Sequence, residues 1–246
     1  MKVKDSLSDR VWDKYIKLFL IVVAFTTVAP FIYVVAGSFA TEKELTERAF
    51  FLIPHTISLN AYKYIIRTGE VFRGLKNSLI ITTIGTLCSL FFTSTFAYPL
   101  SKVHFKGRTL ILNLVIFTMV FSGGMIPTFL VVRQLGLYNH FASVILLTAI
   151  SPFNMIIMKS FFTGIPSELE EAATIDGCND WSIFWRIYIP LSKPVLASIG
   201  LFCAVSFWND YFNAMIYLAD PAKETVQIVL RRIVLLASGG DQINSS

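Results

Sequence analysis

Long apolar runs constrain this chain more than any other feature of its sequence. Five of them, at residues 17–39, 78–100, 109–132, 141–162 and 195–218, contain few charged residues. Each reaches the roughly 20 residues that a helix needs to cross a bilayer. Only 15% of the 246 residues are charged, whereas a soluble domain carries about 25%. The sequence therefore predicts an all-α membrane protein, a bundle with about five transmembrane helices.

The first run resembles a signal peptide, because basic residues such as Lys14 and Lys17 precede it. Its apolar stretch from Leu18 to Phe39 exceeds the roughly 7–15 residues of a signal-peptide core. We therefore expect an uncleaved transmembrane helix, in which Pro30 marks a place for a kink.

Short loops predict the orientation of the chain in the membrane. The 101–108 loop has three Lys or Arg in eight residues, and the 133–140 loop has one. Positive charge favours the cytoplasmic side, so the N-terminus, 101–108 and 163–194 are expected in the cytoplasm. Residues 40–77 then form an extracytoplasmic cap with one or two short helices. Six basic residues in this cap argue the other way, but long translocated segments count little.

Helix breakers interrupt two of the runs. Gly123, Gly124 and Pro127 predict a bend in the third run, and Ser151-Pro152 predicts a break in the fourth. Broken helices are tolerated in membranes where they face protein or a water-filled path. The breaks are therefore a weak indication of transport. The glycines of the third run have two interpretations, a gating bend or small residues that let helices pack closely.

Residues 163–194, between the fourth and fifth runs, read as two helices joined at a glycine. Ser167 and Glu170 match an S-x-x-E capping box that starts a helix at Glu168. Gly177 suits a left-handed end to that helix. An aromatic, amphipathic second helix follows, and Pro190 is expected to stop it. On physical grounds alone, an ordinary interfacial linker remains an equal alternative.

The spacing in this segment resembles the E-A-A-x-x-x-G-x9-I-x-L-P pattern of ABC importer permeases. Ile189 replaces the leucine of that pattern, a mild change. Asp176, Phe184 and Pro194 are similar to the carbohydrate-uptake (MalG-like) subfamily. The stretches GGMIPTFLVVRQLGLYN and FWNDYFNAMIYL are similar to complex-saccharide or aldouronate permeases of Gram-positive bacteria. We call residues 163–194 the EAA loop. Its expected ATPase-coupling residues are Glu171, Ala172, Ala173, Asp176, Gly177, Phe184, Ile187 and Pro190.

The resemblance implies a single type I importer permease domain over residues 1–246 in the bacterial cytoplasmic membrane. Its EAA loop would dock on cytoplasmic ATPase subunits, with Glu171 meeting a basic group there. Two ATPases, a homologous second permease and an extracytoplasmic solute-binding protein would be its partners. Such permeases usually carry a sixth helix, which is missing here. Residues 222–246 instead predict an amphipathic segment, because Arg231 and Arg232 disfavour a span.

Polar residues in the fifth run are the expected substrate-pathway candidates. Ser206, Asn209, Asp210 and Asn213 follow i, i+3, i+4, i+7 spacing, which places them on one face of a continuous helix. An ionisable residue at membrane depth is costly and should face a pathway or a partner. Trp208 could present a flat face to a sugar ring, and Asn154 is a polar residue in the fourth run. The alternative, which we favour, is that these side chains bond neighbouring helices.

Other functional classes find less support. The chain has no GxxxxGK[ST] phosphate loop, so ATP and Mg²⁺ are expected on the partner ATPases. Its three cysteines and three histidines show no metal-ligand spacing. We therefore expect no metal, no cofactor and no nucleic-acid partner. An oligosaccharide importer permease is the leading hypothesis. An importer of amino acids or polyamines, a membrane enzyme and a proton-coupled transporter are the alternatives.

Overall fold

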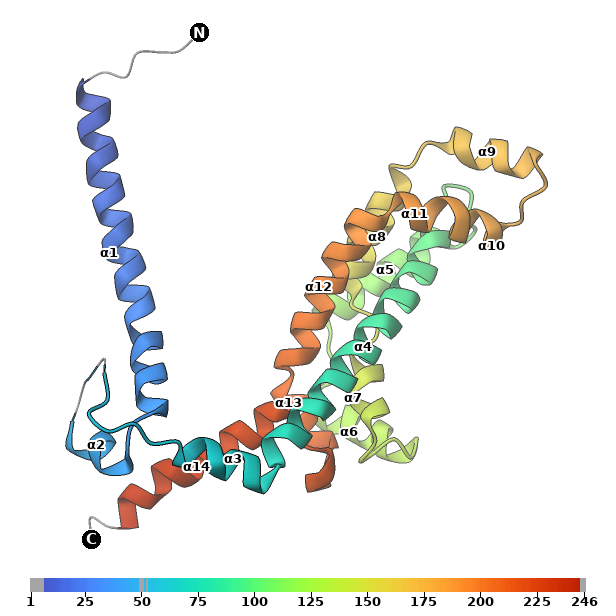
Figure 1. Ribbon diagram of the computed structural model, residues 1–246. Coiled ribbons are helices and arrows are strands. Elements are labelled where there is room, and N and C mark those ends of the chain that lie inside the picture. Colours follow the sequence, from blue (N-terminus) through green and yellow to red (C-terminus); the bar gives the residue numbers. More distant parts are fainter. Residues whose placement is uncertain (1–6, 49–50, 52, 244–246) are drawn as a thin grey trace. The chain divides into compact units, whose positions relative to one another are not determined.

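The computed structural model describes residues 7–48, 51 and 53–243, and this part of the chain contains helices but no strand (Figure 1). It separates into two compact units, which meet in sequence at Gly69 and Glu70. The all-helical prediction is confirmed. Each unit is described by itself below.

The first unit begins with one long apolar helix, α1 (Leu7–Ser38). Apolar side chains such as Phe19, Phe25 and Phe31 are exposed around it, as in a helix surrounded by lipid. The Thr26 and Thr27 hydroxyls donate to backbone carbonyls four residues earlier, at 2.9 and 2.7 Å. Their hydrogen-bonding capacity is thus met inside the helix, as an apolar solvent requires.

The cap follows α1 with two short helices, α2 (Glu42–Glu47) and α3 (Asn60–Thr68). Tyr62 of α3 meets the end of α1, where its hydroxyl lies 2.8 Å from the Ser38 Oγ. The His55 amide donates to Glu44 at 2.9 Å and holds the pKa of that carboxyl below its usual range. The helix of the second apolar run begins eight residues before residue 78, because Glu70–Ser101 is one unbroken helix.

The second unit is built around that long helix, α4 (Glu70–Ser101), against which α8, α12 and α14 pack. The remaining elements of this unit are α5 (Arg108–Val120), α6 (Met125–Gln134), α7 (Phe141–Leu147), α8 (Pro152–Thr163), α9 (Ser167–Ile175), α10 (Asp180–Ile183), the π-helical turn η1 (Phe184–Tyr188), α11 (Ile189–Leu191), α12 (Lys193–Asn209), α13 (Tyr211–Tyr217), the 3₁₀ turn η2 (Pro221–Lys223) and α14 (Val226–Ile243).

Small residues on α4 allow its neighbours to approach closely. The buried positions recur every three to four residues and include Gly74, Gly85 and Ser89. A β-carbon on Gly85 would lie 2.8 Å from the Phe207 ring of α12, and one on Gly74 would lie 3.0 Å from the Val226 backbone of α14. Close backbone approach through small residues is the usual way in which membrane helices pack.

The expected breaks in the apolar runs are present. Among the described residues, α1 and α4 are long and apolar enough to cross a membrane alone, and the number of candidate spans rises to five if each of three bent helix pairs counts as one span. The α5–α6 pair bends by 116° and the α7–α8 pair by 54°. Gly124 has φ +82° at the first break, and Ser151 caps α8 at the second. The third pair bends by 80° at Ser192.

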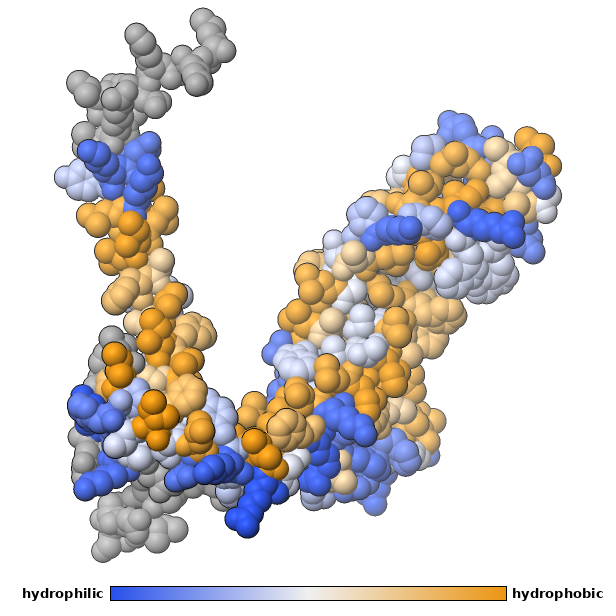
Figure 2. All heavy atoms as spheres, in the orientation of Figure 1, coloured by the Kyte–Doolittle hydropathy of each residue, from blue (hydrophilic) through white to orange (hydrophobic). Residues whose placement is uncertain are grey.

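The connections of the second unit gather at its two ends. At one end, the backbone carbonyl of Asn139 accepts from Lys223 at 2.6 Å, and its side chain accepts from the Asp220 amide. At the other end, Lys102 contacts Glu170. Apolar residues dominate the region between these more hydrophilic ends (Figure 2). The loops thus alternate between the two ends in the order that the charge pattern predicted.

The last helix, α14, is amphipathic as expected. Val226 and Val229 are buried on its inner side, whereas Leu230 and Arg231 are exposed. Arg232 pairs with Glu224 at 2.8 Å and with Glu70 of α4 at 3.0 Å. Arg232 is thus engaged at the end of the second unit, and α14 is not among the candidate spans of the described residues.

Candidate functional site in the EAA loop

The first helix of the EAA loop, α9, starts differently from the prediction. It begins at Ser167, and its N-cap is Pro166 without a side-chain hydrogen bond. The predicted capping box therefore does not form. The physical reason is that the Glu170 carboxylate faces Lys102 and Tyr188 instead of the start of its own helix.

The end of α9 follows the prediction. Gly177 has φ +80°, a left-handed conformation that a residue with a β-carbon adopts at a cost. Its amide donates to Thr174 O at 3.0 Å, and the Cys178 amide donates to Ala173 O at 2.9 Å. These two bonds satisfy carbonyls that the last turn would leave unpaired.

The second helix of the loop ends one residue beyond Pro190, close to the expected stop. The segment runs from α10 through η1 into α11 and ends at Leu191. Within η1, the Ile189 amide donates to Phe184 O, five residues earlier. A proline has no N–H and its ring collides with the carbonyl four residues before it. The wider π-helical turn accommodates Pro190 where a regular α-helix would not.

The π-helical turn places two aromatic rings in the core. Phe184 and Tyr188 are buried and contact Tyr98 of α4, with ring centroids 5.2 and 4.9 Å apart. Tyr188 also meets Phe162 of α8 edge-on, at 5.5 Å. Edge-to-face pairs at these distances are attractive. The aromatic cluster therefore fixes the second helix of the EAA loop to the ends of α4 and α8.

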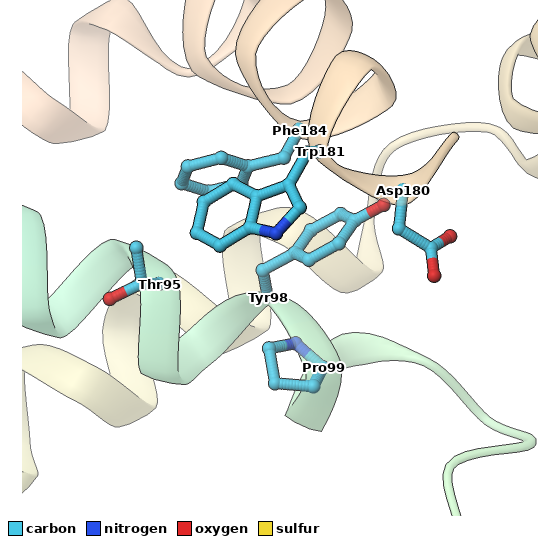
Figure 3. Close-up of a pocket in the computed structure, with 6 residues that line it drawn as sticks. All are labelled: Thr95, Tyr98, Pro99, Asp180, Trp181 and Phe184. Carbon is cyan, nitrogen blue, oxygen red and sulfur yellow. The ribbon is translucent and has the colours of Figure 1, made fainter. Parts of the chain in front are cut away.

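A small pocket of about 250 Å³ lies beside this cluster (Figure 3). In the figure, the Trp181 indole lies next to the Phe184 ring and faces the end of α4 that carries Tyr98 and Pro99. Trp181 is 61% exposed, so its ring remains available at the surface.

A polar cluster links α9 to the rest of the unit. The Lys102 ammonium donates to Glu170 Oε2 and, at 2.8 Å, to the Tyr188 hydroxyl. That hydroxyl donates to the same Glu170 oxygen at 3.0 Å. Burial and the hydrogen bond to Glu170 raise the pKa of Tyr188, which therefore remains a protonated donor. The ammonium also lies over the rings of Tyr98 and Tyr188, at 4.4 and 4.1 Å.

The expected coupling residues separate into two groups. One group is exposed on α9, on the turn after it and on α11, and the other packs into the unit. The exposed group is Glu171, Ala172, Asp176, Gly177 and Pro190; Ala173 and Phe184 are buried, and Ile187 is half-buried. Exposed residues are available to a partner, whereas the buried ones hold the loop in place.

Asp210 breaks the continuous polar face that the spacing predicted in the fifth run. The helix ends at Asn209, and α13 restarts at Tyr211 with Asp210 as its N-cap. Asp210 accepts from the Asn213 amide at 3.1 Å and from the Asn213 side chain at 2.8 Å. The correction has a local cause, since an aspartate that caps a new helix start cannot continue the old one.

Two other pathway candidates meet at one hollow. Asn154 and Ser206 line a space of about 430 Å³ beside the break between α7 and α8. Asn154 donates to Cys203 Sγ at 3.5 Å and so also links α8 to α12. Asn209 donates to its own helix, at Val205 O, and Trp208 accepts from Gln227 through its carbonyl. The structure thus brings together only part of the predicted set.

Sequence reasoning missed Lys102, Tyr98 and Tyr188. Lys102 entered the prediction only as one of three charges in the 101–108 loop, and the two tyrosines carried no motif. Tyr98 and Tyr188 are 90 residues apart in the sequence, so only folding shows that they enclose one ammonium group. No group of three His, Cys, Asp or Glu that could hold a metal ion occurs in the described part of the chain.

The helical architecture and the motif together define the class of protein. A family model described as "Binding-protein-dependent transport system inner membrane component" matches residues 89–244. The chain therefore belongs to this family of ABC importer permeases. It is a transport subunit in a membrane and not an enzyme, and membership implies a solute-binding protein and an ATPase as partners.

Individual members of the family and one solved structure are similar to this chain over most of its length. The chain is 53% identical to Protein LplC of Bacillus subtilis over 96% of its own length and 82% of that protein. It is 51% identical to the polygalacturonan/rhamnogalacturonan transport system permease protein YtcP of the same bacterium, over 95% and 82%. The crystal structure of a bacterial ABC transporter that imports the acidic polysaccharide alginate is similar with a TM-score of 0.88 and 36% identity. That match covers 94% of this chain and 82% of the other.

Proposed function

We propose that this chain is one of two permease subunits in an ATP-driven importer of oligosaccharides. The observation that carries the coupling part of the proposal is the geometry of α9. Glu171, Ala172 and Asp176 are exposed there, while Ala173, Glu170 and the aromatic cluster fix the loop from behind. An exposed helix with small side chains, anchored to the unit through Glu170, suits docking into a groove on a partner.

The proposed mechanism is alternating access. The EAA loop faces the cytoplasm and docks on two ATPase subunits, which hold the ATP and Mg²⁺. Closure of the ATPase dimer displaces α9, and the displacement opens the pathway between this permease and a homologous second one toward the binding protein. The basic 101–108 loop at the same end as α9 supports this orientation.

The names of the relatives support a saccharide as the solute. One relative is named for polygalacturonan and rhamnogalacturonan, and a similar structure is that of a transporter that imports the acidic polysaccharide alginate. Acidic oligosaccharides are therefore the first solutes to test. Asn154 and Ser206 at the hollow offer amide and hydroxyl groups that hydrogen-bond sugars. These names favour a saccharide over an amino acid or a polyamine.

Co-purification of the membrane complex tests the proposal. Glu171→Lys combined with Gly177→Pro should lose the ATPase while keeping the second permease, because the first change reverses a surface charge and the second cannot adopt φ +80°. Glu168→Lys, an exposed change on the same helix, is the matched control. Reconstituted wild type should accumulate a labelled oligogalacturonide and not a labelled amino acid. Retention of the ATPase by the double variant would contradict the docking assignment.

A further inference from the structure

The space between α9 and the rest of the second unit is largely open. A hollow of about 820 Å³ separates them, lined on one side by Glu170, Glu171 and Thr174 and on the other by Lys102 and Phe162. Within α9, all of which is described, Ala173 is the one buried side chain. Apolar packing alone therefore gives α9 little hold on the helices that it would have to move.

The Lys102–Glu170–Tyr188 cluster crosses this hollow. Lys102 follows directly after the last residue of α4, Glu170 lies in the first turn of α9, and Tyr188 ends the π-helical turn. Each of the three side chains bonds the other two. Three separate segments thus share one closed set of charge-assisted hydrogen bonds, which are stronger and more directional than neutral ones.

The surroundings of the Lys102 ammonium favour its hydrogen bonds to Glu170 and Tyr188. Lys102 and Glu170 are only 22% and 27% exposed, so water screens their attraction less than at an open surface. Tyr98 and Tyr188 place their ring faces toward the ammonium, and these two rings contact each other edge-on. Removing the partner of such an enclosed lysine costs more free energy than removing the partner of a solvated one, because a partly buried charge is left unpaired.

We propose that Lys102, Glu170 and Tyr188 form a latch that fixes α9 to the end of α4, so that a displacement of α9 is passed to this long membrane helix. The proposal rests on the proposed function and adds positioning residues to it. Glu171 meets the ATPase, whereas its neighbour Glu170 faces inward and holds the permease. The two adjacent glutamates of α9 thereby have different partners, one on the ATPase and one on this permease.

Coupling in the reconstituted importer tests the latch. Lys102→Gln and Glu170→Gln should still assemble with the ATPase and hydrolyse ATP, but solute moved per ATP should fall by about tenfold, the loss expected for a hydrogen bond between charged groups. The exposed substitutions Lys106→Gln and Glu168→Gln are matched controls and should couple as wild type does. Equal coupling in all four variants would overturn the latch.

A restored tether provides a second measurement. In a Cys178→Ser background, Lys102→Cys with Glu170→Cys should be uncoupled, and a reducible bifunctional thiol cross-linker should restore transport until reductant is added. Uncoupling that persists after complete cross-linking would overturn the proposal, as would loss of the ATPase from the single variants, since the cluster would then serve assembly alone. Failure of the proposed function would show separately, in a wild-type chain that neither retains an ATPase nor transports.

Discussion

At the scale of single residues, Asp210 shows how a carboxylate is accommodated within an apolar run. Its two oxygens accept from the backbone and side chain of Asn213. The cost of an ionisable group in an apolar run is thus reduced by partners within one turn. The same geometry ends α12 and starts α13, so the residue determines where the helix breaks.

Replacement of Asp210 separates a capping role from a role in transport. Asp210→Ala should destabilise the permease by about 1 kcal/mol, since it removes the N-cap of α13. Asp210→Asn keeps an acceptor and should melt close to wild type. The measurement is thermal unfolding in detergent. If the asparagine variant is stable but inactive in transport, Asp210 has a direct role in the pathway beyond capping.

At the scale of helices, the packing of α4 against α12 depends on the absence of side chains. The Phe207 ring occupies the space that a β-carbon on Gly85 would need. The side chains of Ser89, one turn after Gly85, and Cys203, one turn before Phe207, lie 3.2 Å apart. The interface therefore combines a steric fit with a weak polar contact, and neither tolerates added volume.

Gly85→Val should lower the melting temperature, because overpacking of this kind costs about 1–3 kcal/mol. The matched control is Gly123→Val, since a β-carbon on Gly123 meets nothing within 4 Å. Thermal unfolding of both variants under the same detergent conditions is the measurement. Similar melting temperatures for the two would show that the α4–α12 contact yields more easily than the structure indicates.

At the scale of the molecule, the second unit has two distinct ends. One gathers the 101–108 loop with α9 and η1, and the other gathers residues 137–140 with residues 217–223. In a transporter these two ends face different compartments. The proposed orientation assigns the end with the EAA loop to the cytoplasm.

Labelling with a membrane-impermeant maleimide tests that orientation. In a Cys178→Ser background, a cysteine replacing His104 should react only in inverted membrane vesicles. A cysteine replacing Leu135 should react in intact cells, since both positions are exposed at opposite ends of the unit. The unsubstituted background is the control for the membrane cysteines Cys88 and Cys203. The reverse pattern of labelling would place the EAA loop outside and contradict the docking proposal.

Local chemistry explains which predictions were confirmed. Gly124 and Gly177 adopt the left-handed conformation where glycine was expected to end or bend a helix, and Pro152 begins α8 after a break. These outcomes depend on backbone sterics at one position. The capping box at Glu170 failed, because a distant lysine outweighed the local preference, whereas the helix expected to stop at Pro190 ends one residue later, at Leu191.

The sequence by itself determined the membrane class, the number of apolar runs, the breaks within them and the family motif, because hydropathy and glycine or proline sterics act over a few residues. Only the tertiary structure decided which motif residues face outward and that Lys102 meets Glu170 and Tyr188. Those outcomes depend on side chains 68 and 86 residues apart. Their contact depends on how the helices pack, which no local pattern encodes.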